Sequence, residues 1–162
     1  MSFGKIQSAE GYDKIKALVQ EVLFRKKTFV FFSCDNVDPV SLKVETGFES
    51  SGTGSSTTIP TEDELKSNWE KFFKFAQEKA KDPWYAVYDF GYFVSDGNFR
   101  STLVLFSYIP DNQKGKIKMV YSTNVQSIKD AFNIPFLIQA NDLDDINRDR
   151  IVENITRIQI TF

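Results

Sequence analysis

Two long β-type segments joined by a tight turn restrict the fold of this chain more than any other feature. Residues 84–94 and 99–109 are rich in aromatic and β-branched side chains, which favour strands. The Asp96-Gly97 pair between them supplies the positive φ angles that a tight hairpin turn requires. Residues 103–106 are apolar at consecutive positions, as in strands that are covered on both faces. The sequence therefore predicts a long hairpin at the centre of a sheet, with helices on both sides.

The residues before this hairpin predict a helix, a pair of strands and a loop. Apolar residues recur at helical spacing over residues 12–23, which predicts an amphipathic helix. Residues 28–34 and 41–48 have the composition of paired strands. Residues 49–58 are rich in Gly, Ser and Thr and have no periodicity, so we expect a flexible insertion there.

The helix that leads into the hairpin has a clear start signal. Thr61 and Glu64 form a capping-box pattern, in which each side chain accepts a hydrogen bond from the backbone of the other. The aromatic residues that follow fall on one helical face. This stripe is more typical of core packing than of a ligand site.

The residues after the hairpin predict two further helices and two short strands. The pattern predicts a third helix over residues 122–132 and a strand over residues 136–140. Asp142 is placed to cap a fourth helix. The alternating tail of Ile158, Ile160 and Phe162 predicts a last edge strand.

This order of elements, αββαββαβα, defines the expected fold. It predicts an α/β protein with a central mixed sheet of five or six strands and helices on both faces. A chain of 162 residues is long enough for one globular domain. We expect a single domain over residues 1–162.

The composition excludes many functions. The chain has no histidine and one cysteine, Cys34, which removes histidine-based catalysis, most transition-metal sites and any internal disulfide. The net charge of −2 gives no support for nucleic-acid binding. Asp142, Asp144 and Asp145 are better explained by helix capping than by a metal site. We expect no enzyme activity, no cofactor and no metal.

The termini and apolar stretches also limit the location. The longest apolar stretches are far shorter than the roughly 20 residues that span a bilayer. The first residues lack the apolar core of a secretory signal. We expect a cytoplasmic, monomeric protein that does not span a membrane.

A short basic stretch follows the hairpin and has two interpretations. Lys114, Lys116 and Lys118 precede Met119. The pattern alone fits a solvated loop, or a cationic rim around an apolar anchor for a protein or an anionic lipid surface.

Several motifs on both sides of this stretch are similar to those of a known family. They are Trp84-Tyr-Ala-Val-Tyr-Asp-Phe90, Pro110-Asp111, Lys116-Ile-Lys-Met-Val-Tyr-Ser122 and Ile138-Gln-Ala-Asn-Asp142. The set resembles the actin-depolymerising factor/cofilin family and implies an ADF-homology domain. The resemblance is closest between residues 84 and 157.

The resemblance implies two sets of actin-binding residues. The monomer site would comprise Ser2, Phe3, Gly4, Lys116, Lys118, Met119, Ser122, Gln126 and Lys129, with the lysines and Met119 at the start of a long helix. The filament site would comprise Arg100, Glu153 and Arg157. Phosphorylation of Ser2 would add negative charge to the monomer site and oppose binding.

The chain also departs from the family pattern at four positions. Thr102 stands where a basic residue is usual, Val125 and Asp130 occupy positions that are often basic or acidic, and Asn154 replaces a common arginine. We therefore expect binding to monomeric actin, with a preference for its ADP state, and weaker binding to filament sides that promotes disassembly with little severing. Phosphoinositides are a further candidate partner for the lysines. The alternative is a module similar to glia maturation factor or coactosin, which binds an actin-related complex or filaments only.

Overall fold

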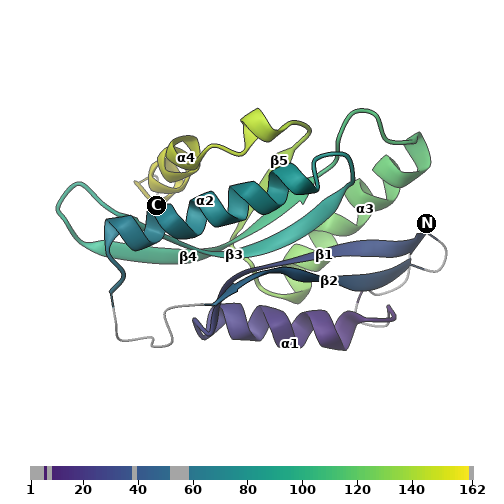
Figure 1. Cartoon of the computed structure of the whole chain (residues 1–162), viewed down its shortest axis with the longest axis horizontal. Coiled ribbons are helices and arrows are strands. Elements are labelled where there is room, and N and C mark those ends of the chain that lie inside the picture. The colour runs from purple at the N-terminus through teal and green to yellow at the C-terminus, as the bar shows by residue number, and fades with distance from the viewer. Residues whose placement is uncertain (1–5, 7–8, 38–39, 52–58, 161–162) are drawn as a thin grey trace.

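The computed structural model describes residues 6, 9–37, 40–51 and 59–160 (Figure 1). Within these residues the helices are α1 (Tyr12–Leu23), α2 (Glu62–Glu78), α3 (Gly115–Ala131), the short 3₁₀ helix η2 (Leu143–Asp145) and α4 (Arg148–Ile160). The strands are β1 (Lys27–Val37), β2 (Val40–Ser51), β3 (Trp84–Phe93), β4 (Phe99–Tyr108) and β5 (Phe136–Ala140). The predicted order of helices and strands is confirmed.

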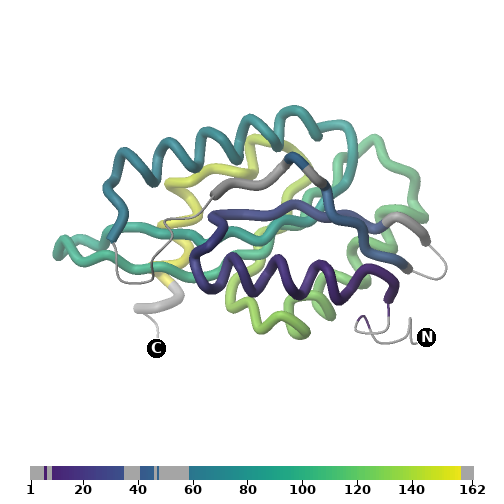
Figure 2. The backbone as a smooth tube through the Cα atoms, turned by 60° about the horizontal axis from the view of Figure 1, so that its bottom comes forward, coloured from purple at the N-terminus to yellow at the C-terminus, as the bar shows by residue number. Residues whose placement is uncertain are grey.

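One mixed sheet connects all of these strands. Its order is β2-β1-β3-β4-β5, with every pair antiparallel except the parallel pair of β4 and β5. Helices α1 and α3 cover one face, and α2 and α4 cover the other (Figures 1 and 2). The predicted α/β fold is therefore confirmed, with five strands among the described residues. None of the helices in the described ranges is long and apolar enough to cross a membrane.

The predicted hairpin forms the middle of this sheet. Strands β3 and β4 pair without a break from Trp84↔Tyr108 to Phe93↔Phe99. The turn is closed by the Val94 amide, which donates to the Asn98 carbonyl at 2.9 Å. Gly97 has the positive φ that this turn needs, at 86°. Side chains of β3 alternate between the two faces, so this strand contributes to both halves of the core.

The first helix is joined to the edge of the sheet at a glycine. Gly11 precedes α1 with a φ of 85°, and a Cβ atom at this position would lie 1.9 Å from the Leu42 carbonyl oxygen. The close approach lets the Leu42 amide donate to the Glu10 carbonyl at 2.7 Å. A residue with a side chain does not fit there.

Two predicted boundaries, the end of the second strand and the start of the third helix, were wrong. Residues 49–51 belong to β2, where they pair with β1, and residues 52–58 lie outside the described residues. Helix α3 begins at Gly115, earlier than the periodicity indicated. The sequence gives no signal for this start, because the residue before it, Lys114, makes no side-chain cap. Lys116 and Lys118 are therefore helical, as the resemblance implied, while Lys114 precedes the helix in an extended conformation.

The C-terminal segment differs most from its prediction. Asp142 does cap a helix, since its carboxylate accepts from the Asp144 amide at 2.8 Å, but this helix is only η2. The longer helix α4 has its own cap, Asn147, whose side chain accepts from the Arg150 amide at 3.1 Å.

The predicted edge strand at the C-terminus was also wrong. Ile158 and Ile160 lie in α4, and Phe162 lies outside the described residues. Ile151 and Ile155 are buried on one face of this helix, and this helical spacing outweighs a short alternation at the tail.

The connection between α1 and β1 is held to the hairpin by Arg25. This residue has a φ of 63°, which is uncommon for a residue other than glycine. Its guanidinium pairs with the Asp89 carboxylate at 3.7 Å and donates to the Ser101 hydroxyl at 2.7 Å. The same group lies 5.4 Å from the centre of the Phe99 ring. These contacts attach the end of α1 to the half of the hairpin that is nearer its turn.

This cluster predicts a pH dependence of stability. Burial raises the pKa of Asp89 from 3.8 to about 6, with Arg25 acting in the opposite direction. The folded protein therefore binds the Asp89 proton more tightly than the unfolded chain. The resulting stabilisation is complete below pH 3.8 and is lost as the pH rises through about 6. It amounts to at most about 3 kcal/mol of unfolding free energy.

Asp89→Asn should flatten this dependence in urea unfolding curves recorded at several pH values. Asp111→Asn, a change at an exposed carboxylate, is the matched control and should keep the wild-type slope. An unchanged slope in Asp89→Asn would show that Asp89 does not cause it.

Candidate protein-binding surface

Helix α3 buries one face against the sheet and exposes the other. The buried residues are Val120, Tyr121, Asn124, Val125 and Ile128. Met119, Ser122 and Gln126 lie on the opposite face, and Met119 is 54% exposed. The buried face fixes the helix, so the exposed face is presented as a rigid surface.

Tyr121 anchors this helix to two other parts of the fold. Its hydroxyl accepts from the Cys34 amide at 3.0 Å and donates to the Pro83 carbonyl at 3.2 Å. The Tyr85 hydroxyl donates to the Tyr121 carbonyl at 2.8 Å, and the two rings stack with centroids 4.7 Å apart. The helix is thereby tied to β1, to β3 and to the connection before β3. The sequence analysis did not assign this role to Tyr121.

The lysines are placed where they do not stabilise the helix. Lys116 and Lys118 lie near the N-terminus of α3, and the first turn has no acidic residue. The helix dipole is positive at this end, so cations there are disfavoured by about 0.3–1 kcal/mol. Lys118 and Lys129 follow one side of the exposed face, and Lys116 lies on its other side. A cationic rim around Met119 is the result, and it suits a partner with an acidic surface.

One polar contact crosses the exposed face. The Gln126 amide donates to the Asp130 carboxylate at 2.9 Å, one helical turn further along. Asp130 is one of the departures from the family pattern. Another departure, Val125, is buried in the core, so its apolar character serves packing and does not alter the surface.

The predicted filament residues lie at a different place. Arg100 is exposed near the start of β4, and Glu153 and Arg157 are exposed on α4, about one helical turn apart. The Arg157 guanidinium donates to the Asn154 side chain at 3.1 Å. The turn between β3 and β4 and the C-terminal half of α4 lie at the same end of the molecule (Figures 1 and 2). The N-terminal end of α3 lies at the opposite end.

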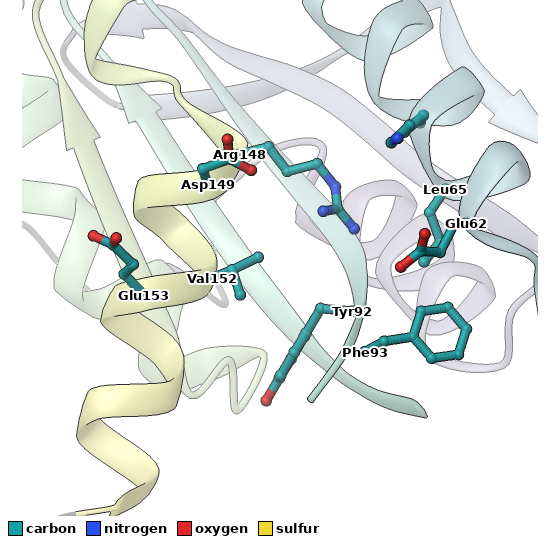
Figure 3. Close-up of a pocket in the computed structure, with 9 residues that line it drawn as sticks. Glu62, Leu65, Tyr92, Phe93, Arg148, Asp149, Val152 and Glu153 are labelled. Carbon is teal, nitrogen blue, oxygen red and sulfur yellow. The ribbon is translucent and has the colours of Figure 1, made fainter. Parts of the chain in front are cut away.

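A hollow of about 280 Å³ adjoins these residues between α2, β3 and α4. Figure 3 shows that Arg148 extends from the first turn of α4 toward α2. Its guanidinium donates to the Gly91 carbonyl at 2.6 Å and lies 5.2 Å from the centre of the Phe90 ring. Glu153 and Tyr92, the strand partner of Arg100, also line the hollow. The side chains that line the hollow include both acidic and basic residues. They do not include a nucleophile next to a general base, the arrangement that covalent catalysis needs.

Three further predictions concern the N-terminal residues, the acidic cluster and the cysteine. Ser2, Phe3 and Gly4 lie outside the described residues, so their assignment stays a prediction. The Asp142 carboxylate accepts from the Asp144 amide, which confirms that it caps a helix, and the Asp145 carboxylate accepts from the Asn141 amide just before that helix. Burial raises the pKa of the Cys34 thiol to about 11, so this cysteine stays protonated and unreactive at neutral pH.

Tyr121→Phe tests the anchoring of α3. The change keeps the ring but leaves the Cys34 amide and the Pro83 carbonyl without their partner, so unfolding free energy should fall by about 1–3 kcal/mol. Tyr12→Phe is the control, since none of the hydrogen bonds found among the described residues involves its hydroxyl and its ring stacks on Phe132. Urea unfolding measures both. Equal stability of Tyr121→Phe and the wild type would contradict the anchoring role.

Comparison with known proteins finds similarity to cofilins. Residues 9–156 match the family described as cofilin/tropomyosin-type actin-binding protein. Cofilin from Schizosaccharomyces pombe is 34% identical over 96 residues, which cover 58% of this chain and 69% of that protein. The chain spans about half the length of two other curated cofilins that it matches, 52% and 53%.

Solved structures show the same fold. Cofilin from Streptomyces griseoflavus has a TM-score of 0.64 at 22% identity, over 90% of this chain and 95% of that one. Human coactosin-like protein also has a TM-score of 0.64, at 14% identity, over 92% of this chain and 98% of that one. Because the family match covers most of the sequence, this chain belongs to the cofilin/tropomyosin-type actin-binding protein family and folds as an ADF-homology domain.

Proposed function

We propose that this protein binds monomeric actin through the exposed face of α3. The observation that carries the proposal is the placement of Lys116 and Lys118 beside Met119, at a helix end where cations are unfavourable. Residues that do not stabilise their own helix are better explained by a partner. Family membership identifies actin as the partner to test first.

The geometry of α3 fits recognition by a helix in a groove. Met119 supplies an apolar anchor, and the lysines around it contribute to the rate of encounter and to orientation. Because Tyr121 and the buried face hold the helix in place, little conformational entropy is lost on binding. We infer that monomer affinity depends mainly on this small set of residues.

Filament binding is the second part of the proposal. Arg100, Glu153 and Arg157 lie at the other end of the molecule from the N-terminal end of α3, so they are placed to contact a second actin subunit. Thr102 and Asn154 stand where the family commonly has basic residues, and an exposed charge contributes up to about 1 kcal/mol. The protein is therefore proposed to bind filament sides more weakly than monomers, with disassembly and little severing.

The same departures favour a second candidate function. A coactosin-like or glia-maturation-factor-like module would bind filaments or an actin-related complex and would not hold monomeric actin. Competition with labelled cofilin for monomeric actin separates the candidates. Displacement of the cofilin supports the first, and filament binding without displacement supports the second.

The double change Lys116→Ala and Lys118→Ala tests the proposed monomer site. It removes two of the cations around Met119, and affinity for fluorescent ADP-actin monomer should fall by about tenfold. Met119→Ala should cause a loss of similar size by removing the apolar anchor. Titration of the purified variants measures both effects.

The control is Lys71→Ala with Lys74→Ala, which removes the same charge from an exposed part of α2 on the other side of the sheet. Its affinity should equal that of the wild type. If the α3 variants stay within about twofold of the control, the assignment of α3 as the monomer site is wrong.

A further inference from the structure

The end of α1 presents two large apolar side chains to solvent. Leu23 and Phe24 are adjacent in the chain and are 57% and 63% exposed. Of the large hydrophobic residues in the described ranges, only Ile59 and Met119 are exposed to a similar degree. Adjacent exposed side chains of this size are typical of a contact surface. The proposed monomer site on α3 does not include them.

The backbone that carries this pair is held firmly. The amides of Phe24, Arg25 and Lys26 donate to carbonyls of α1 at 2.9, 3.0 and 2.8 Å. The Arg25 guanidinium is fixed by Asp89 and Ser101, as described above. The pair is therefore displayed in one conformation of the backbone, which reduces the entropic cost of binding.

The position of the pair relates it to the proposed filament site. Arg25 contacts Phe99 and Ser101, the two residues that flank Arg100 in β4. Side chains alternate along the strand, so these contacts lie on the α1 side of the hairpin and Arg100 lies on the α4 side. The hairpin turn projects beyond the helices at this end of the molecule (Figures 1 and 2). A partner that meets this end contacts both sides of the hairpin.

The predicted filament residues lack an apolar component. Arg100, Glu153 and Arg157 are all charged, whereas protein interfaces have an apolar or aromatic centre with a polar rim. An interface of ordinary size buries about 800 Å² on each partner, a patch about 30 Å across. A patch of that size around Arg100 extends to the turn that carries Leu23 and Phe24.

We propose that Leu23 and Phe24 form the apolar centre of the filament-binding surface, with Lys26 and Arg100 as its exposed cationic rim. This inference rests on the proposed function and adds residues to its filament site. Both surfaces then have the same chemistry, an apolar anchor beside lysine or arginine. Similar surfaces at opposite ends of one molecule suit a partner that presents one kind of acidic surface repeatedly, as the subunits of a filament do.

The double change Leu23→Ser and Phe24→Ser tests the inference in the full chain. Co-sedimentation with actin filaments should show affinity reduced by about tenfold, because aromatic and aliphatic centres dominate binding. Affinity for monomeric actin should stay within about twofold of the wild type. Lys14→Ser with Ala17→Ser places two serines on exposed positions of the same helix and should change neither affinity.

Salt dependence gives an independent readout. The loss caused by the serine changes should persist at high salt, because it removes apolar contact. The loss caused by Arg100→Ala should shrink as salt increases. Thermal unfolding of every variant checks that the fold is retained.

Three results would overturn the inference. If Arg100→Ala weakens filament binding and the serine variant does not, the filament site stands without Leu23 and Phe24. If the wild type binds no filament, the proposed filament function fails together with this inference, while the monomer titration still tests α3. If sedimentation shows a dimer that the serine changes dissociate, the pair is covered by a second copy of the chain.

Discussion

The burial of strand β3 on both faces is the constraint on which the rest of the structure depends. Tyr85 and Val87 face α1 and α3, while Trp84, Tyr88 and Phe90 face α2 and α4. A strand with this composition is stable only where both faces are covered, so helices must pack on each side. The position of α3 follows directly, because the hydroxyl and ring of Tyr85 contact Tyr121.

Because of this arrangement, one face of α3 stabilises the fold and the opposite face is available for binding. The inner face of α3 carries the packing and hydrogen bonds that hold it, and the outer face has little part in the core. Residues on the outer face are therefore free to be chosen for a partner. Lys116 and Lys118 illustrate this freedom, because the helix dipole disfavours them and no acidic residue of the first turn offsets them.

Sequence patterns predicted the parts of the fold that depend on local chemistry. The capping box of Thr61 and Glu64 forms as expected, and the hairpin turns at Asp96-Gly97 as expected, although only Gly97 of that pair has a positive φ. Local periodicity missed the start of α3 because Lys114 and Gly115 give no capping signal, whereas the family resemblance placed Lys116 and Lys118 at the start of a long helix. The break between η2 and α4 was missed because Asp142 and Asn147 are both good caps, and only the structure shows that each begins its own helix.

The candidate site was less accessible to sequence reasoning, for two physical reasons. Contacts such as that of Arg25 with Ser101 join residues far apart in the chain, so no local pattern reports them. The effect of a departure from the family pattern also depends on where the residue lies in the structure. Val125 belongs to the core, whereas Asp130 and Asn154 accept hydrogen bonds from Gln126 and Arg157. Both departures therefore act through a neighbouring side chain, because a partner that binds Gln126 or Arg157 must first compete with Asp130 or Asn154 on the same helix.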